Sequence, residues 1–333
     1  MRGLRFRIFP IVGPCLALTA SLAAALDINV LILKDLKENG TYLAMNNSGN
    51  LEDKGVALLS QSRLLSKLHA LVLTSHGIGD EGAVALARSK YLGNLKILNL
   101  FHNVIGEKGA SAIAQSATLK NLTALNLWGN KIGPEGARAL ADSTNLAQLV
   151  SLDLTGNNIG AEGVKAIARS TALRNLRELH LAKNNMGDEG LAALGRSATL
   201  ANLTLLDLSD NGLSQEGIKA LSASESITKL EKLFLGDNGL GNGGARTVAQ
   251  SPNFKDLNEL NLERNGIDDA GADWLAQSAV LVNVQILALW GNRISDTGAK
   301  AIRESETLKK VTNPIYPSDS EKATPPVSQE IKD

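Results

Sequence analysis

The chain has 333 residues, which is enough for one to three domains of ordinary size. Its 34 lysines and arginines balance its 34 aspartates and glutamates, so charge excludes a strong attraction to nucleic acid or to an anionic membrane. Aromatic residues make up only 3% of the chain and glycine occurs 31 times, a composition that favours many small, similar units over one enlarged core.

The first 25 residues combine a basic start with an apolar run. Three arginines lie within the first seven residues, and the run "IFPIVGPCLALTASLAAAL" ends in small residues before Leu26. This arrangement predicts a secretory signal peptide over residues 1–25, and hence a secreted or periplasmic protein with no membrane segment after cleavage. An uncleaved membrane anchor is the alternative, since the run is about long enough to span a bilayer. Two prolines and a glycine interrupt the run and favour the signal peptide.

Cys15 lies in this run and is the only cysteine. A mature chain without cysteine excludes disulfides, thiolate nucleophiles and cysteine-ligated metals together. The sequence also has no glycine-rich phosphate loop and no paired-histidine motif, so it predicts neither a cofactor nor a metal site.

From residue 52 to residue 310 the chain repeats one phrase every 27 residues. "LTALNLWGNKIGPEGARALA" at 122–141 is preceded by "LKILNLFHNVIGEKGASAIA" and followed by "LVSLDLTGNNIGAEGVKAIA". A period of this size is the signature of a solenoid, in which each unit buries its apolar face against its neighbours. One asparagine position recurs in every later copy, with His76 in its place in the first: Asn103, Asn130, Asn157, Asn184, Asn211, Asn238, Asn265 and Asn292.

Each copy of the phrase predicts a strand followed by a helix. Leu125 and Leu127 alternate with other side chains, which is the period of a half-buried strand. In residues 133–143 the apolar residues are three and four apart, which places them on one face of a helix. A glycine, serine or aspartate stands where each helix begins, and we expect it to be the N-cap. These residues are Gly79, Gly106, Gly133, Gly160, Gly187, Ser214, Gly241, Asp268 and Ser295.

Strand–helix units stacked in parallel form a curved α/β solenoid. Neighbouring strands lie about 4.8 Å apart, whereas packed helices need about 8–10 Å. We therefore expect a horseshoe with parallel strands on the concave face and helices on the convex face. Residues 26–51 match the repeat poorly and are predicted to form an N-terminal cap, with Tyr42 to Met45 as an irregular first strand. Residues 311–333 contain many prolines and few apolar residues, and are predicted to be a disordered tail.

The repeated phrase resembles those of leucine-rich repeat proteins, in particular the ribonuclease-inhibitor-like subclass with its long repeats and helical outer face. The helix phrases "GAVALA" at 82–87 and "GARALA" at 136–141 are also similar to bacterial GALA-type repeats. The resemblance covers residues 50–310. No "LP"-led segment similar to an F-box precedes the repeats, so the ubiquitin-ligase adaptor role of some GALA-type proteins is not implied.

Residues that recur in nearly every copy are expected to build the scaffold. Asn130 is predicted to hydrogen-bond backbone groups where the chain leaves its strand, as one rung of an asparagine ladder. A serine ends each helix, where its hydroxyl can satisfy open carbonyls, and so many equivalent serines cannot all be nucleophiles. These serines are Ser89, Ser116, Ser143, Ser170, Ser197, Ser224, Ser251, Ser278 and Ser305.

Function is expected in the side chains that vary along the exposed side of the strands. Phe101 and Trp128 occupy the same position in neighbouring repeats, so they should lie about one strand spacing apart on the concave face. Exposed aromatic side chains are favoured anchors at protein interfaces. The alternative is that the two rings cover each other or neighbouring loops. The predicted partner-binding residues are Asn99, Phe101, Asn126, Trp128, Asp153, His180, Asp207, Phe234 and Trp290.

His180 is flanked by Asp153 and Asp207 in neighbouring repeats, with Glu178 two residues away on the same face. A histidine between carboxylates can act as a general base or a metal ligand. A hydrolase or metal-dependent enzyme centred on His180, Asp153 and Asp207 is therefore one hypothesis, and a solvated polar face is the simpler interpretation.

The sequence favours a non-enzymatic interaction module that binds a protein partner on its concave face. A monomer is expected, with no cofactor and no nucleic-acid partner. An exported or host-directed binding protein would fit a bacterial source.

Overall fold

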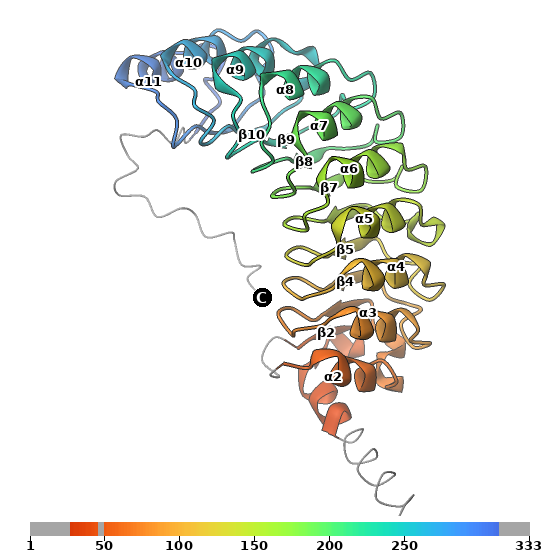
Figure 1. Ribbon diagram of the computed structural model, residues 1–333. Helices are drawn as coiled ribbons and strands as arrows, with labels where there is room; N and C mark the ends of the chain where they lie inside the picture. The colour runs from red at the N-terminus through yellow and green to blue at the C-terminus, as the bar shows by residue number, and fades with distance from the viewer. Residues whose placement is uncertain (1–26, 46–49, 313–333) are drawn as a thin grey trace, which may run out of the picture.

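The computed structural model describes residues 27–45 and 50–312. The predicted signal peptide at 1–25 and residues 313–333 of the predicted tail lie outside the described residues. Figure 1 shows a curved solenoid, with the strands along the inner side of the curve and the helices along the outer side. The predicted horseshoe is confirmed.

The strands form one 11-stranded sheet in sequence order. Its strands are β1 (Leu36–Lys37), β2 (Tyr42–Ala44), β3 (Ala70–Val72), β4 (Ile97–Asn99), β5 (Ala124–Asn126), β6 (Ser151–Asp153), β7 (Glu178–His180), β8 (Leu205–Asp207), β9 (Lys232–Phe234), β10 (Glu259–Asn261) and β11 (Ile286–Ala288). From β2 to β11 all neighbours pair in parallel. β1 instead pairs with β2 antiparallel, because a short turn joins them where the later strands are joined through a helix.

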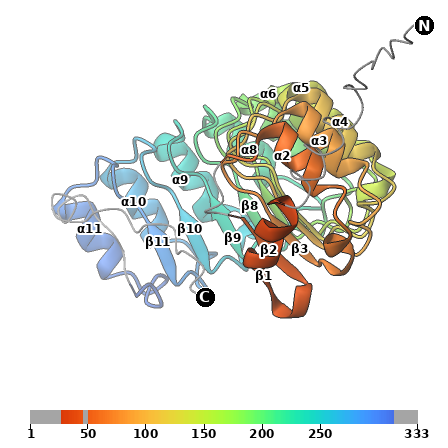
Figure 2. The ribbon, with the colours of Figure 1, turned by 90° about the horizontal axis from the view of Figure 1, so that it is seen from below.

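One α-helix follows each strand from β2 onward, and the helices of neighbouring repeats pack against each other. The helices are α2 (Glu52–Leu59), α3 (Asp80–Ala87), α4 (Glu107–Gln115), α5 (Gly133–Ala141), α6 (Gly160–Arg169), α7 (Gly187–Gly195), α8 (Gln215–Ser222), α9 (Gly241–Gln250), α10 (Asp269–Ala276) and α11 (Asp296–Arg303). In the view from below, α2 to α6 overlap on one side of the picture and α10 and α11 lie on the other, because the solenoid curves (Figure 2).

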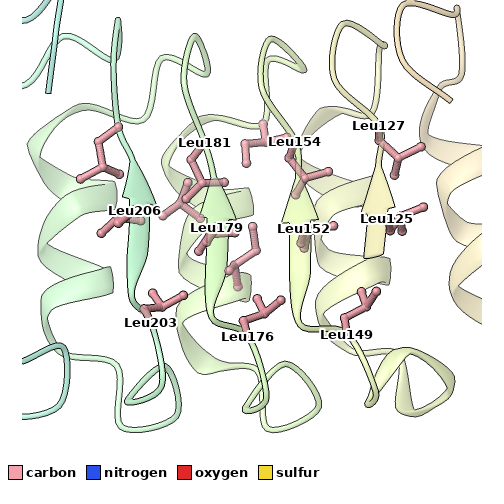
Figure 3. Close-up of a cluster of buried hydrophobic side chains, with 14 of the residues drawn as sticks. Leu125, Leu127, Leu149, Leu152, Leu154, Leu176, Leu179, Leu181, Leu203 and Leu206 are labelled. Atoms are coloured by element: carbon pink, nitrogen blue, oxygen red, sulfur yellow. The ribbon is translucent and has the colours of Figure 1, made fainter. Parts of the chain in front are cut away.

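Columns of leucine fill the space between the sheet and the helices. Leu125 pairs in register with Leu152, and Leu152 with Leu179, so leucines stand at the same height on neighbouring strands (Figure 3). Leu127 and Leu154 form the next column and are fully buried. Before the first repeat, residues 27–35 are helical, and Ile28, Ile32 and Leu43 of the N-terminal segment are buried in the same core.

The asparagine ladder is present and links each repeat to the one before and the one after it. The Nδ2 amide of Asn130 donates to the carbonyls of Leu100 and Leu127, and its Oδ1 accepts the backbone N–H of Ile105. Asn130 is 8% exposed, so these bonds satisfy backbone groups that water does not reach. The serines also link repeats: the hydroxyl of Ser143 donates to the carbonyl of Ala114 at the end of the preceding helix.

The helices begin in two different ways, and the predicted N-cap is wrong for four of them. In α5, α6, α7 and α9 the predicted glycine is the first helical residue, and the N-caps are Ile132, Ile159, Met186 and Leu240. At Gly106 the backbone is extended and its N–H donates to the Asp80 carboxylate of the preceding repeat at 2.8 Å. At Gly133 the φ angle is +65°, and its N–H donates to the carbonyl of Asn157 in the following repeat. Extended starts occur at Gly79, Gly106, Ser214, Asp268 and Ser295, and positive φ occurs at Gly133, Gly160, Gly187 and Gly241.

Candidate protein-binding face

In five strands the side chain of the last residue accepts a hydrogen bond from the backbone of the turn that follows. Asn99 accepts the N–H of Phe101, and Asn126 accepts the N–H of Trp128, both at 2.9 Å. Asp153 and Asp207 make the same bond to the residues two positions on. These four predicted binding residues therefore also have a structural role, which the repeat pattern alone does not reveal. Each orients the next exposed side chain on the concave face.

Phe101 and Trp128 are in contact, as their positions in neighbouring repeats predict. Their ring centroids lie 4.8 Å apart with the planes at 66°, an edge-to-face arrangement. Phe101 is partly buried, whereas Trp128 remains 40% exposed. His102, which the repeat pattern does not single out, has its ring centroid 5.1 Å from that of Phe101 and extends the aromatic surface. We call Phe101 and Trp128 the aromatic pair.

The part of the concave face around the aromatic pair carries no charged side chain at its wall positions. Here a wall position is the first or third residue of a strand, or the residue two places after the strand ends. On β3, β4 and β5 these are Ala70, Val72, Thr74, Ile97, Asn99, Phe101, Ala124, Asn126 and Trp128. Ile97 is 45% exposed, so apolar surface extends below the aromatic pair toward the start of the strands. Such a surface suits apolar groups of a partner.

The next three strands bring His180 and its carboxylates together. The register pairs His180 with Asp153 on one side and with Asp207 on the other. His180 Nδ1 lies 3.9 Å from Asp207 Oδ2, within ion-pair range and beyond an ordinary hydrogen bond. Burial acts to lower the pKa of His180, but Asp207, Asp153 and Glu178 outweigh it and hold that pKa above its ordinary value. Burial raises the pKa of the Asp153 carboxyl.

Within residues 27–45 and 50–312, no group of three or more histidine, cysteine, aspartate or glutamate side chains is placed to hold a metal ion.

Phe234 and Trp290 are on the concave face but far from the aromatic pair. β9 lies four strand spacings from β5, about 19 Å. The guanidinium of Arg264 lies 3.9 Å from the Trp290 ring centroid and also contacts Asp237 Oδ1 at 3.1 Å. Trp290 therefore already has a cation on its ring, whereas Trp128 makes its ring contact with another aromatic side chain.

A separate open hollow of about 530 Å³ lies at the edge of the sheet where the strands begin. Polar and basic side chains line it, including His69, Lys96 and Lys120. The aromatic pair does not line this hollow, so it is distinct from the predicted binding residues.

The family comparison agrees with this geometry. A family model described as "Leucine Rich repeat" matches segments that together cover more than half of the chain: 65–87, 94–114, 118–141, 148–168, 172–195, 199–222, 255–276 and 281–302. The chain therefore belongs to the leucine-rich repeat family, whose domains are typically protein-binding scaffolds. Residues 228–250 fall outside the matched segments, yet β9 and α9 fold as one more repeat.

A comparison with curated proteins gives no match. Among solved structures, an internalin from Listeria monocytogenes is similar, with 20% identity, a TM-score of 0.30, and coverage of 78% of this chain and 92% of that chain. In the part of the chain that the structure describes, no helix is both long and apolar enough to cross a membrane.

Proposed function

We propose that the protein is a non-enzymatic interaction module that holds a protein partner against its concave face. The exposure of Trp128 beside Phe101 carries the proposal. Tryptophan at the centre of an interface commonly contributes a large share of the binding free energy. A leucine-rich repeat scaffold supplies the rigid curved surface on which such a residue stays preorganised.

The repeats themselves argue that the scaffold does not need these rings. At the position of Trp128, other repeats carry Thr74, Thr155, Ala182, Ser209 and Gly236, and their strands pair in the same register. A residue that the fold does not require, and that leaves a large apolar side chain in water, is better explained by recognition.

Binding is a better account of His180 than catalysis. His180 stands in a row of strand residues along an open wall, and its partners Asp153 and Asp207 also hold turn backbone. The competing hypothesis is a hydrolase or metal-dependent enzyme centred on these three residues. Metal analysis of the purified protein and a general hydrolase screen, each repeated with His180→Gln, would separate the two. Activity lost in that variant would favour the enzyme.

Export of the chain is part of the proposal and rests on the basic and apolar N-terminal sequence. Protein isolated from its native cells should begin near Leu26. An intact Met1 would argue for the uncleaved anchor or for a chain that stays inside the cell.

The proposed function is tested by affinity capture with the full chain and with Phe101→Ala/Trp128→Ala. Removing the aromatic pair should change stability by about 0.5 kcal/mol or less, as is usual for surface positions. It should weaken binding by about 2 kcal/mol or more, which is roughly 30-fold.

Trp274→Ala is the matched control, because Trp274 is 38% exposed but lies on α10, on the convex face. The control should retain the partner. If the double variant also retains full affinity, the binding surface lies elsewhere; if it unfolds, the pair is structural.

A further inference from the structure

Three carboxylates on the concave face have no lysine or arginine partner and share only His180. They are Asp153 on β6, Glu178 on β7 and Asp207 on β8, and we call them the wall carboxylates. Among the described residues, no lysine or arginine lies within ion-pair distance of any of the three. The cations nearest to β7 in the sequence, Arg177 and Lys183, lie beyond its two ends.

The neighbouring strands show what a compensated wall looks like. On β9 and β10, Lys232 Nζ lies 2.9 Å from Glu259 Oε2. Just beyond the strand ends, Arg264 pairs with Asp237. The same sheet therefore pairs Glu259 and Asp237 with cations, although Glu263, at the wall position after β10, is in no ion pair among the described residues. The wall carboxylates stand apart from this pattern, with only His180 between them.

Partial burial increases the effect of this uncompensated charge. The side chains of His180 and Asp207 are 28% and 22% exposed. Charges at such positions interact more strongly than charges in bulk water, because less water surrounds them. A cation delivered by a partner would relieve the repulsion among the carboxylates. A partner carboxylate would add to it.

The wall carboxylates adjoin the aromatic pair. β6 is the neighbour of β5, and Asp153 pairs in register with Asn126, two residues before Trp128. From β5 to β8 the wall spans three strand spacings, about 15 Å. An extended segment of about five residues covers that distance. One short stretch of a partner can therefore reach both surfaces.

We propose that the partner presents a lysine or arginine side chain to the wall carboxylates and an apolar side chain to the aromatic pair. The proposal rests on the proposed concave binding function and narrows it to a basic and apolar protein segment. Neutral β3–β5 and acidic β6–β8 together form the complementary surface.

The test uses random peptides displayed on phage, selected on the immobilised full chain and then synthesised for affinity measurements. The key variant is Asp153→Asn/Glu178→Gln/Asp207→Asn. Asparagine keeps the turn bond at the two strand ends, as Asn99, Asn126 and Asn261 show in their own repeats. Unfolding of each variant is followed by circular dichroism.

The matched control is Glu81→Gln/Glu107→Gln/Glu135→Gln, which removes three exposed carboxylates from the convex helices α3, α4 and α5. Its net charge equals that of the key variant. A difference in affinity between the two variants therefore reflects where the carboxylates were removed and not the change in net charge.

We expect selected peptides to combine lysine or arginine with a large apolar residue. The key variant should lose at least about tenfold in affinity, and the control should lose less than about twofold. Added salt should weaken binding to the parent chain more than binding to the key variant.

Peptides without basic residues, or equal affinity for the parent and the key variant, would overturn the inference. If the selected peptides show either of these results but bind Phe101→Ala/Trp128→Ala more weakly than the parent chain, the proposed concave binding function stands and only the inference of a basic segment fails. Peptides insensitive to both sets of changes would count against both. Self-association of the parent chain that the key variant abolishes would identify a second copy as the occupant and overturn the assignment to a separate basic partner.

Discussion

Leu127 and Trp128 are consecutive residues with opposite environments. Leu127 is fully buried between sheet and helices, and Trp128 is 40% exposed on the concave face. Strand alternation causes the difference, because successive side chains point to opposite sides of a sheet. At this scale the repeat separates residues that hold the solenoid together from residues that are available to a partner.

The buried side can be tested with Leu127→Ala. The leucine column would lose one member between Leu100 and Leu154, both fully buried, and the cavity should cost about 2–5 kcal/mol. Chemical denaturation measures the loss. Leu205→Ala is the control, since Leu205 is only partly buried at the first residue of β8. Equal losses for the two variants would contradict the inward assignment of Leu127.

His180 predicts a pH dependence of stability. Its pKa is raised in the folded chain by Asp207, Asp153 and Glu178, against the effect of burial. A raised histidine pKa stabilises the fold fully below the unfolded value of about 6.5, and this contribution is lost as pH rises through the folded value.

His180→Gln should therefore lose more stability relative to the parent chain at pH about 5.5 than at pH about 8.5. Denaturant midpoints at the two pH values measure the difference. Asp207→Asn should reduce the same pH dependence, because it removes the nearest carboxylate. A difference between His180→Gln and parent that does not change with pH would contradict the assignment.

At the scale of elements, the preceding repeat decides how each helix begins. Where the preceding helix carries an aspartate or asparagine in its first turn, that side chain accepts the next backbone N–H and the backbone stays extended. These acceptors are Asp53, Asp80, Asp188, Asn242 and Asp269. Where the corresponding residue is Glu107, Pro134, Ala161 or Gln215, a glycine with positive φ follows.

This difference predicts opposite outcomes for one substitution at two equivalent glycines. Gly133→Ser should cost about 1–2 kcal/mol, because a side chain is strained at φ +65° although space is open around it. Gly106→Ser should stay within about 0.5 kcal/mol. Its hydroxyl can donate to Asp80, as Ser214 Oγ donates to Asp188 Oδ2 at 2.5 Å. Denaturation of the two variants gives the comparison, and equal losses would contradict the rule.

At the scale of the molecule, stability comes from contacts between neighbouring repeats. The asparagine ladder, the serine bonds and the helix starts all contain bonds between neighbouring repeats, which join residues 24 to 30 positions apart. The asparagine and serine bonds recur between successive repeats, so they do not require one particular pair of repeats, provided that the period is kept.

A deletion of one whole repeat should therefore be tolerated. Removing residues 145–171 takes out β6 and α6 and places Asn130 beside Asn184. Gly187 would then follow the repeat of Pro134, which still lacks an aspartate at that position. We expect a folded chain with one cooperative unfolding transition by circular dichroism. Removing only residues 152–171 breaks the 27-residue period, and this variant should not unfold cooperatively. If it folds like the parent chain, the register between repeats matters less than we infer.

The period, the strand alternation and the apolar face of each helix could be predicted from the sequence, because every repeat contains the same local pattern of apolar residues. They were enough to predict the solenoid, the inward leucines and the contact between Phe101 and Trp128. Strand and helix periodicity are enough for these predictions, since neighbouring repeats are related by a shift of 27 residues and equivalent residues therefore lie side by side.

Four features needed the tertiary structure: the antiparallel β1, the two kinds of helix start, the turn bonds of Asn99 and its equivalents, and Arg264 over Trp290. In the sequence, Trp128 and Trp290 look equivalent, and Gly106 and Gly133 look equivalent. They differ because side chains of adjacent repeats occupy, or leave open, the space around them. A single repeat contains no information about that space, so only the stacked structure decides which ring stays exposed and which carboxylates stay unpaired.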